Sequence, residues 1–203
     1  ADDAARPQAP LTARGPADRP SGSMHPVRAL AGSVLLLASL ARAHPRILDD
    51  QEIGSNALIV MFGGIETTEG LIANALWAMF HHPDVLARAR ASDAELDLAL
   101  EESLRWEPAV QTCTRYAAEA CTLHGAEIPE GATVQCMIGA MNRDPAHYAD
   151  PDRYDPWRRE SLGHSAFGFG RHFCLGAALA KVEARVAIRR LFEAYPSLRF
   201  DAA

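Results

Sequence analysis

The chain has 203 residues, of which 48% are hydrophobic, and a formal net charge of −6 at pH 7. This length is enough for one domain with its own core, and the acidic balance argues against nucleic-acid binding as the main function. There is no CxxC pair among the four cysteines, which are Cys113, Cys121, Cys136 and Cys174. We therefore expect a reduced, cytoplasmic protein rather than a secreted one held together by disulfides.

The first part of the chain divides into a proline-rich segment and an apolar run. Residues 1–28 are rich in Ala, Pro, Arg and Asp, and their prolines break any helix, so we predict a poorly ordered segment there. The apolar run at 29–40, with basic residues before it and Ala-Arg-Ala after it, resembles a signal peptide. Because this run starts well inside the chain and is too short to span a bilayer, we favour a buried helix ending near Ala43. Residues 29–203 would then form the folded domain.

A long helix is predicted over residues 50–82, starting at one of two adjacent aspartates that can cap it and ending before a proline. Residues 57–62 and 71–80 are apolar nearly all round, which predicts a helix buried on most sides. A membrane span is the alternative. We reject it because Glu66 and Glu69 lie at the middle, where each carboxylate would cost about 2.5–3.5 kcal/mol.

The middle of this helix carries glycines and polar groups. The pair Gly63-Gly64 costs up to about 2 kcal/mol relative to two alanines, which suggests that a ligand must approach the helix closely. Glu66 and Thr67 follow directly, and the threonine hydroxyl can bond back to a carbonyl one turn earlier and bend the helix. The alternative is a tight helix crossing at the glycines, with Glu66 paired to a cation.

Two further helices are predicted before residue 108. The first covers residues 84–91, and Ser92 with Glu95 then predicts a capping box for the second. Leucines at four-residue spacing mark the buried face of that second helix: Leu96, Leu100 and Leu104. Glu102 and Arg105 are three residues apart and can meet on one side of it. Such a pair is usually exposed and contributes little energy.

Short strands and turns follow. The predicted strands are 114–116, 121–124 and 133–137, with a turn at 128–131. No internal repeat and no second domain boundary is visible in the remaining sequence.

The glycine-rich stretch at 167–176 reads Phe-Gly-Phe-Gly-Arg-His-Phe-Cys-Leu-Gly and precedes a last helix predicted from about Cys174 to Glu193. That helix has one apolar face, made by Leu175, Leu179, Val182 and Val186. At the helix N-terminus, free N–H groups and the positive dipole end would stabilise a Cys174 thiolate. Glycines allow close backbone approach and phenylalanines offer flat apolar surface, so the loop suits a haem iron with a cysteine axial ligand. The alternative is a turn whose cysteine only packs against the phenylalanines.

The pattern Phe167-x-x-Gly170-x-His172-x-Cys174-x-Gly176 matches, position by position, the haem-binding signature of the cytochrome P450 family. The resemblance implies a fold that is mainly α with a small β part, namely the haem-side half of the cytochrome P450 architecture. It runs from about residue 29 to 200 and corresponds to roughly the C-terminal half of a family member, so we expect a partial, N-terminally truncated haem domain.

The resemblance also implies a cofactor, haem b (iron protoporphyrin IX), with Cys174 as the axial ligand of the iron. Cofactor-binding residues on the matched positions are Gly63, Gly64, Arg115, Phe167, Gly168, His172, Cys174 and Gly176. Among them Arg115 and His172 match propionate contacts. Residues 63–68 resemble the family's oxygen-binding motif, which implies Glu66 and Thr67 as the catalytic residues that deliver protons.

Glu102-x-x-Arg105 resembles the family's E-x-x-R motif, for which Arg153 matches the third member. These three residues are expected to have a structural role. Pocket-lining residues are expected to include Ile59, Phe62, Gly63 and Val110.

The implied function is haem-thiolate monooxygenation, which inserts one oxygen atom from dioxygen into a small apolar organic substrate. Electrons would come from a separate ferredoxin or flavoprotein, since the sequence contains no G-x-G-x-x-G fingerprint. The alternative is a truncated, catalytically impaired haem-binding or structural fragment. Two other readings of Cys174, a hydrolase nucleophile and a zinc ligand, lack the accompanying residues at suitable spacing.

Overall fold

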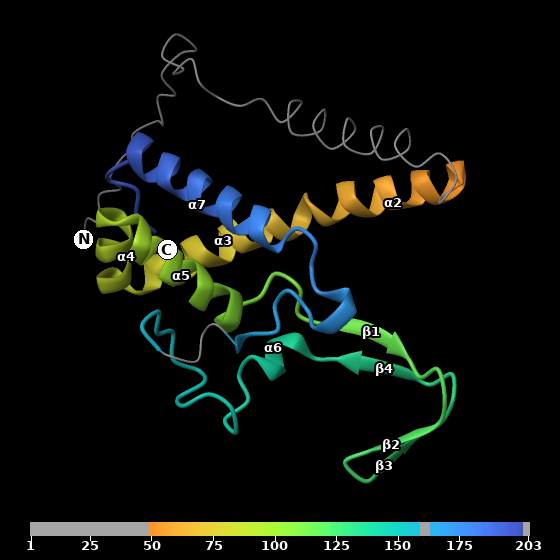
Figure 1. Ribbon diagram of the computed structural model, residues 1–203. Coiled ribbons are helices and arrows are strands. Elements are labelled where there is room, and N and C mark those ends of the chain that lie inside the picture. Colours follow the sequence, from red (N-terminus) through yellow and green to blue (C-terminus); the bar gives the residue numbers. More distant parts are fainter. Residues whose placement is uncertain (1–48, 159–162, 201–203) are drawn as a thin grey trace, which may run out of the picture. The chain divides into compact units, whose positions relative to one another are not determined.

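The computed structural model describes residues 49–158 and 163–200, and the predictions for residues 1–28 and 29–43 lie outside this range (Figure 1). The chain divides into two compact units, Ala1–Ala57 and Leu58–Ala203. The described part is mainly α with a small β part, as predicted. Its helices are α2 (Asp50–Gly63), α3 (Glu66–His81), α4 (Pro83–Ala91), α5 (Asp93–Trp106), α6 (Ile138–Met141) and α7 (Ala177–Ala194), with a 3₁₀ turn η2 (Gly170–His172). Its strands are β1 (Cys113–Tyr116), β2 (Cys121–Leu123), β3 (Ala126–Ile128) and β4 (Thr133–Cys136).

The predicted long helix is two helices, α2 and α3. A full capping box opens α2: the Glu52 N–H donates to Asp49 Oδ1 and the Asp49 N–H donates to Glu52 Oε2, both at 2.8 Å. The chain leaves the helix at Gly64 and Ile65, where the low helix propensity of the glycine pair permits a break. The continuous helix over residues 50–82 was therefore wrong in its middle.

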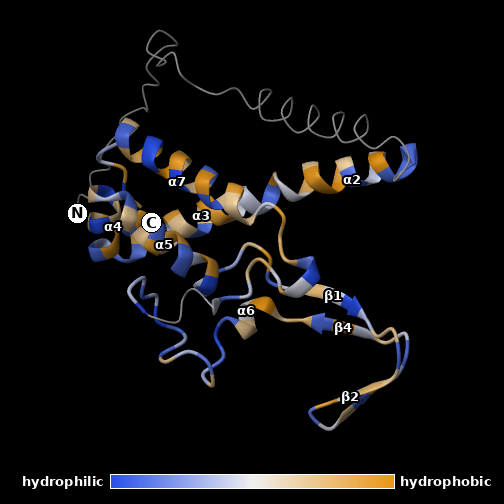
Figure 2. Ribbon diagram, viewed as in Figure 1, coloured by the Kyte–Doolittle hydropathy of each residue, from blue (hydrophilic) through white to orange (hydrophobic). Residues whose placement is uncertain are grey.

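The predicted burial of residues 57–62 was also wrong. No residue of α2 is buried, and the apolar residues at 58–62 are exposed. Figure 2 shows the hydrophobic colouring of this helix. An apolar composition shows only that a face can be covered, not which part of a protein covers it. The prediction holds better for α3, where Leu71, Ala75, Ala78 and Met79 are buried.

The core lies among α3, α4, α5 and α7. The predicted leucine face of α5 is confirmed, since Leu96, Leu100 and Leu104 are all at most 3% exposed. They pack in one cluster with residues such as Val85 from α4 and Ile188 from α7. Tyr154 joins this cluster, and its hydroxyl donates to the Ala99 carbonyl of α5 at 2.8 Å. Burial raises the pKa of Tyr154 well above its ordinary value.

Three ion pairs join α5 to α7 along one side. They are Asp93–Arg189 at 2.7 Å, Asp97–Arg185 at 2.8 Å and Glu101–Lys181 at 3.3 Å. From one pair to the next, the residue number rises by four along α5 and falls by four along α7. The two helices therefore run in opposite directions, with about one turn between successive pairs.

The predicted capping box at the start of α5 was wrong. Ser92 is the N-cap residue and has an extended backbone, but its side chain makes no capping hydrogen bond. The Glu95 carboxylate instead accepts from Arg88 at 2.8 Å and from the indole N–H of Trp157 at 2.9 Å. These two donors hold the pKa of Glu95 below its ordinary value.

The strands form two antiparallel pairs, β1 with β4 and β2 with β3. Strand β3 was not predicted. It follows β2 through a tight turn at His124-Gly125, where both residues have positive φ (49° and 81°). A type I′ hairpin turn has this geometry, and the common Asn-Gly signal is replaced here by His-Gly. Among the described residues, no helix combines the length and the apolarity needed to cross a membrane.

We expect Leu100→Ala to lower the free energy of unfolding by about 2–5 kcal/mol, because it leaves a cavity in the centre of the α5 face. Urea unfolding followed by circular dichroism measures this. Leu98→Ala on the exposed side of α5 is the matched control and should change the stability by about 0.5 kcal/mol or less. Equal effects of the two substitutions would contradict the assignment of the core.

Candidate haem site

The cysteine loop, defined here as residues 163–176, is closed by backbone hydrogen bonds. The Cys174 N–H donates to the Phe167 carbonyl at 2.8 Å, and the Phe173 N–H donates to the Gly170 carbonyl at 3.0 Å. Gly168 and Gly170 have φ of 75° and 66°, a conformation that other residues rarely adopt. Two of the three glycines between residues 167 and 176 are therefore required by the path of the backbone itself.

Helix α7 begins at Ala177, three residues later than predicted. Cys174 thus precedes the helix, and its carbonyl accepts from the Ala177 N–H at 3.3 Å. Gly176 is the N-cap residue. The side chain of Cys174 is exposed, so the thiol is not enclosed by the phenylalanines around it.

Apolar side chains beside Cys174 are also exposed. Phe169 is 92% exposed and Leu175 is 93% exposed, whereas Phe167 packs partly against the core. The predicted apolar face of α7 faces away from the core, since Leu179, Val182 and Val186 are exposed. A different set of residues attaches α7 to the core: Ala177, Ala184, Ile188 and Phe192. Figure 2 shows that apolar residues recur along α7.

Glu66 and Thr67, the expected catalytic residues, lie in the first turn of α3. The Thr67 hydroxyl donates to the Gly63 carbonyl four residues earlier, as predicted. Glu66 is exposed. A β-carbon added at Gly63 would meet no atom within 4 Å, so within the described residues no helix crosses closely at this glycine.

An open hollow beside Gly63 is lined by residues of α2. Its lining residues are Leu58, Ile59, Met61, Phe62 and Gly63. Three of the four expected pocket residues are among them, and Val110 is not.

The two expected propionate contacts lie on different elements. Arg115 is exposed on β1, and its guanidinium donates to the Thr114 carbonyl at 2.9 Å. His172 is exposed at the end of η2. Both side chains are accessible to a ligand.

Glu102 and Arg105 form a buried pair, with both side chains fully inaccessible. The guanidinium binds the carboxylate in a bidentate manner, with Nε to Oε2 at 2.9 Å and Nη2 to Oε1 at 2.8 Å. An ion pair three residues apart on a helix is usually exposed and contributes little to the free energy of unfolding. This pair is buried instead.

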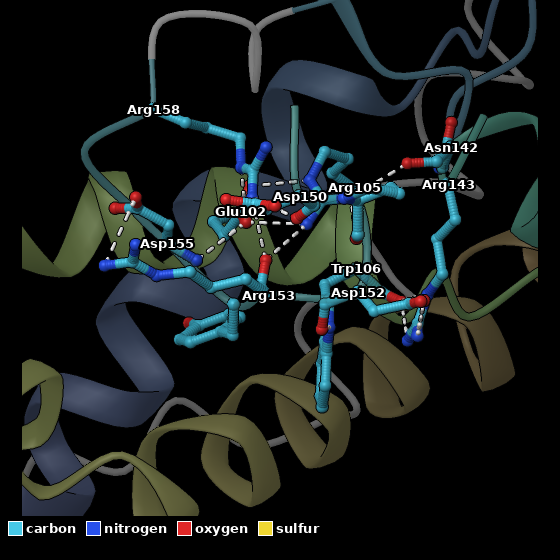
Figure 3. A network of polar contacts seen from close by, with 12 residues as sticks. Glu102, Arg105, Trp106, Asn142, Arg143, Asp150, Asp152, Arg153, Asp155 and Arg158 are labelled. Carbon is cyan, nitrogen blue, oxygen red and sulfur yellow. Dashed lines mark hydrogen bonds and ion pairs between the residues drawn. The ribbon is translucent and has the colours of Figure 1, made fainter. Parts of the chain in front are cut away.

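The third member of this network is Arg158, and the prediction of Arg153 was wrong (Figure 3). Arg158 Nε donates to Glu102 Oε1 at 2.9 Å, and its side chain is 5% exposed. Arg153 contributes its backbone carbonyl, which accepts from Arg105 at 2.9 Å, while its side chain is exposed and pairs with Asp155. Both arginines lie in one short irregular segment, and sequence spacing does not distinguish which of them turns inward. The buried Pro156, two residues before Arg158, is the nearest sequence signal.

Asn142 links this network to the cysteine loop. Its backbone carbonyl accepts from Arg105 at 2.9 Å, and its buried side-chain amide donates to the Leu104 carbonyl at 3.3 Å. Its side-chain oxygen accepts from the Ser165 N–H at 2.7 Å. From the sequence, residues 142–145 were expected only to resemble the family's packing segment before the haem loop, and the individual contacts of Asn142 were not predicted.

Comparison with known proteins agrees with these motifs. The family model "Cytochrome P450" matches residues 95–198, and the chain belongs to the cytochrome P450 family. It is 45% identical over 157 residues to the cytochrome P450 monooxygenase PikC of Streptomyces venezuelae, which covers 77% of this chain and 38% of the relative. It is 37% identical over 151 residues to the biotin biosynthesis cytochrome P450 of Bacillus subtilis, which covers 74% and 38%.

Solved structures support the same fold. P450BioI in complex with a fatty-acid-ligated acyl carrier protein has a TM-score of 0.73 and 33% identity, covering 87% of this chain and 49% of that one. Ligand-free CYP164A2 of Mycobacterium smegmatis has a TM-score of 0.77 and 33% identity, covering 87% and 46%. The chain thus spans about two fifths of the length of these curated relatives. Curated relatives of the chain are named as a cytochrome P450 monooxygenase and a hydroxylase.

We expect Arg158→Ala to lower the free energy of unfolding by about 3 kcal/mol, because it leaves the buried Glu102 carboxylate with only one guanidinium. Arg153→Ala removes an exposed side chain and should cost about 1 kcal/mol or less. Urea unfolding of both variants measures the difference. A larger loss for Arg153→Ala than for Arg158→Ala would contradict the network in Figure 3.

Proposed function

We propose that this chain carries the haem-side half of a haem-thiolate monooxygenase, which inserts one oxygen atom from dioxygen into a small apolar organic substrate. The observation that carries the proposal is the exposed Cys174 thiol in a loop whose glycines have left-handed backbone, in a chain of the cytochrome P450 family.

The residues at this site fit haem b. Cys174 offers one soft sulfur ligand for iron, and the exposed Phe169 and Leu175 offer apolar surface for a flat macrocycle. Arg115 and His172 are accessible basic side chains for the two propionates. When bound, haem supplies the activation of dioxygen, and a cysteine thiolate ligand favours cleavage of the O–O bond.

Glu66 and Thr67 are proposed to move protons. The Thr67 hydroxyl hydrogen is committed to the Gly63 carbonyl, so its oxygen acts as an acceptor and can hold a proton donor beside the helix. Glu66 is exposed and can exchange protons with solvent. Together they would pass a proton from solvent to the reacting oxygen by general acid catalysis.

Electrons are proposed to come from a separate ferredoxin or flavoprotein.

The hollow beside Gly63 is lined by apolar residues of α2 and is proposed to contact the apolar substrate. The cytoplasm is the proposed location, because all four cysteines are free thiols, as a reducing compartment favours.

A second candidate function is a haem-binding or structural fragment that lacks a complete substrate pocket. One observation favours it: apolar residues of α2 and α7 are exposed, among them Phe62 and Leu179.

We expect the purified chain to take up haemin and, after reduction and addition of carbon monoxide, to show the red-shifted Soret band of a thiolate-ligated haem. Cys174→Ser should abolish this band, because a serine oxygen does not replace the thiolate. Cys121→Ser is the matched control, since Cys121 is also exposed but lies on β2. A band that survives Cys174→Ser would refute the assignment of the ligand.

Turnover separates the two candidate functions. The haem-loaded chain is given hydrogen peroxide and a panel of apolar substrates, and oxygenated products are measured by mass spectrometry. Products that vanish in Cys174→Ser support the monooxygenase. Thiolate-ligated haem without any product supports the fragment.

A further inference from the structure

His164 is a buried histidine at the start of the cysteine loop, with a side chain that is 4% exposed. Its Nδ1 accepts from the Ala166 N–H at 3.2 Å. A ring nitrogen that accepts a hydrogen bond carries no proton, so this contact assigns the ring proton to Nε2.

The Nε2 atom faces a carboxylate on α5. It lies 3.3 Å from Glu101 Oε1, within the distance of an ion pair but without the alignment of a hydrogen bond. Within residues 49–158 and 163–200, His164 Nε2 is the one buried side-chain nitrogen or oxygen atom that lacks a hydrogen-bond partner. A buried donor in this position requires an explanation, because burial without a partner is costly.

Glu101 also reaches α7. Its Oε2 lies 3.3 Å from Lys181 Nζ, and Lys181 is the single lysine of the sequence. Burial favours the neutral form of Glu101, but His164 and Lys181 outweigh it and hold the pKa of this carboxyl below its ordinary value. The carboxylate is therefore charged and bridges the loop to α7.

A short path leads from His164 to the cysteine. The ring of His164 lies 5.9 Å from the ring of Phe167, and Phe167 packs against the core. The Phe167 carbonyl accepts the N–H of Cys174 at 2.8 Å. Anything that holds Phe167 in place thus also holds the backbone of Cys174.

We propose that His164 is a positioning residue for Cys174. Its ring is buried beside the Glu101 carboxylate of α5, which Lys181 of α7 contacts in turn, and the ring supports Phe167, whose carbonyl fixes the backbone of the cysteine. The role of Cys174 as a haem ligand rests on the proposed function, whereas the ordering of the loop by His164 can be tested without haem.

The test compares two variants of similar size. His164→Leu removes the polar ring beside the Glu101 carboxylate and retains most of the bulk, whereas His164→Gln retains an N–H group near the position of Nε2. Hydrogen exchange of the chain without haem is followed by mass spectrometry on the peptide that contains Phe173 and Cys174. We expect His164→Leu to accelerate exchange there about tenfold and His164→Gln to stay within about threefold of the parent chain.

Arg185→Leu is the matched control, because it breaks the neighbouring ion pair with Asp97 between the same two helices. It should lower the melting temperature without accelerating exchange at Cys174. Unchanged exchange in His164→Leu, or equal acceleration in Arg185→Leu, would overturn the proposal, since the second result would trace the effect to the general stability of α5 and α7.

The haem-loaded protein gives an independent readout. In His164→Leu a smaller fraction of haem should show the thiolate-type carbon monoxide band than in the parent chain, and His164→Gln should restore that fraction. The same fraction in His164→Leu as in the parent chain would count against the proposal. If the parent chain itself shows no such band, the proposed haem site fails, and the exchange data alone decide the role of His164.

Discussion

The burial of the Glu102 carboxylate with the Arg105 guanidinium is the constraint on which the described structure depends. Charged groups removed from water require a partner for every polar atom, and here the partners come from chain segments far apart in sequence. Arg105 donates to carbonyls of Asn142, Pro151 and Arg153 besides the carboxylate. The irregular chain between residues 142 and 158 has no ladder of its own, and it is positioned by these donors instead.

The same network extends toward the cysteine loop. Asn142 has its carbonyl on Arg105 and its side-chain oxygen on Ser165, so one buried residue joins α5 to the segment that precedes Phe167. A charged core pair can in this way influence the geometry of an exposed thiol. The free-energy cost of burying the two charges is offset by the hydrogen bonds that Arg105 donates to the surrounding chain.

Much of the helical core could be predicted from the sequence, because leucine spacing on α5 and the positions of prolines report local and periodic preferences. The back-bond from Thr67 to Gly63 was predictable for the same reason, since it lies within one turn. The choice of Arg158 over Arg153 was not, because both lie in an irregular segment where tertiary contacts decide which side chain turns inward. The exposure of α2 was missed because apolar composition does not reveal which partner covers a face. The assigned haem and proton-transfer residues remain predictions, drawn from a strong local motif.

The ladder of ion pairs between α5 and α7 differs in kind from the inner Glu102–Arg105 pair. Two of its three pairs have an acidic side chain at the surface, since Asp93 and Asp97 are about half exposed or more, whereas Glu101 is mostly buried. Dissolved ions screen such contacts over roughly 8 Å at physiological ionic strength, whereas the inaccessible pair is shielded from them. Added salt should therefore act selectively. It would weaken the outer contacts between α5 and α7 before it weakens the buried pair in the interior.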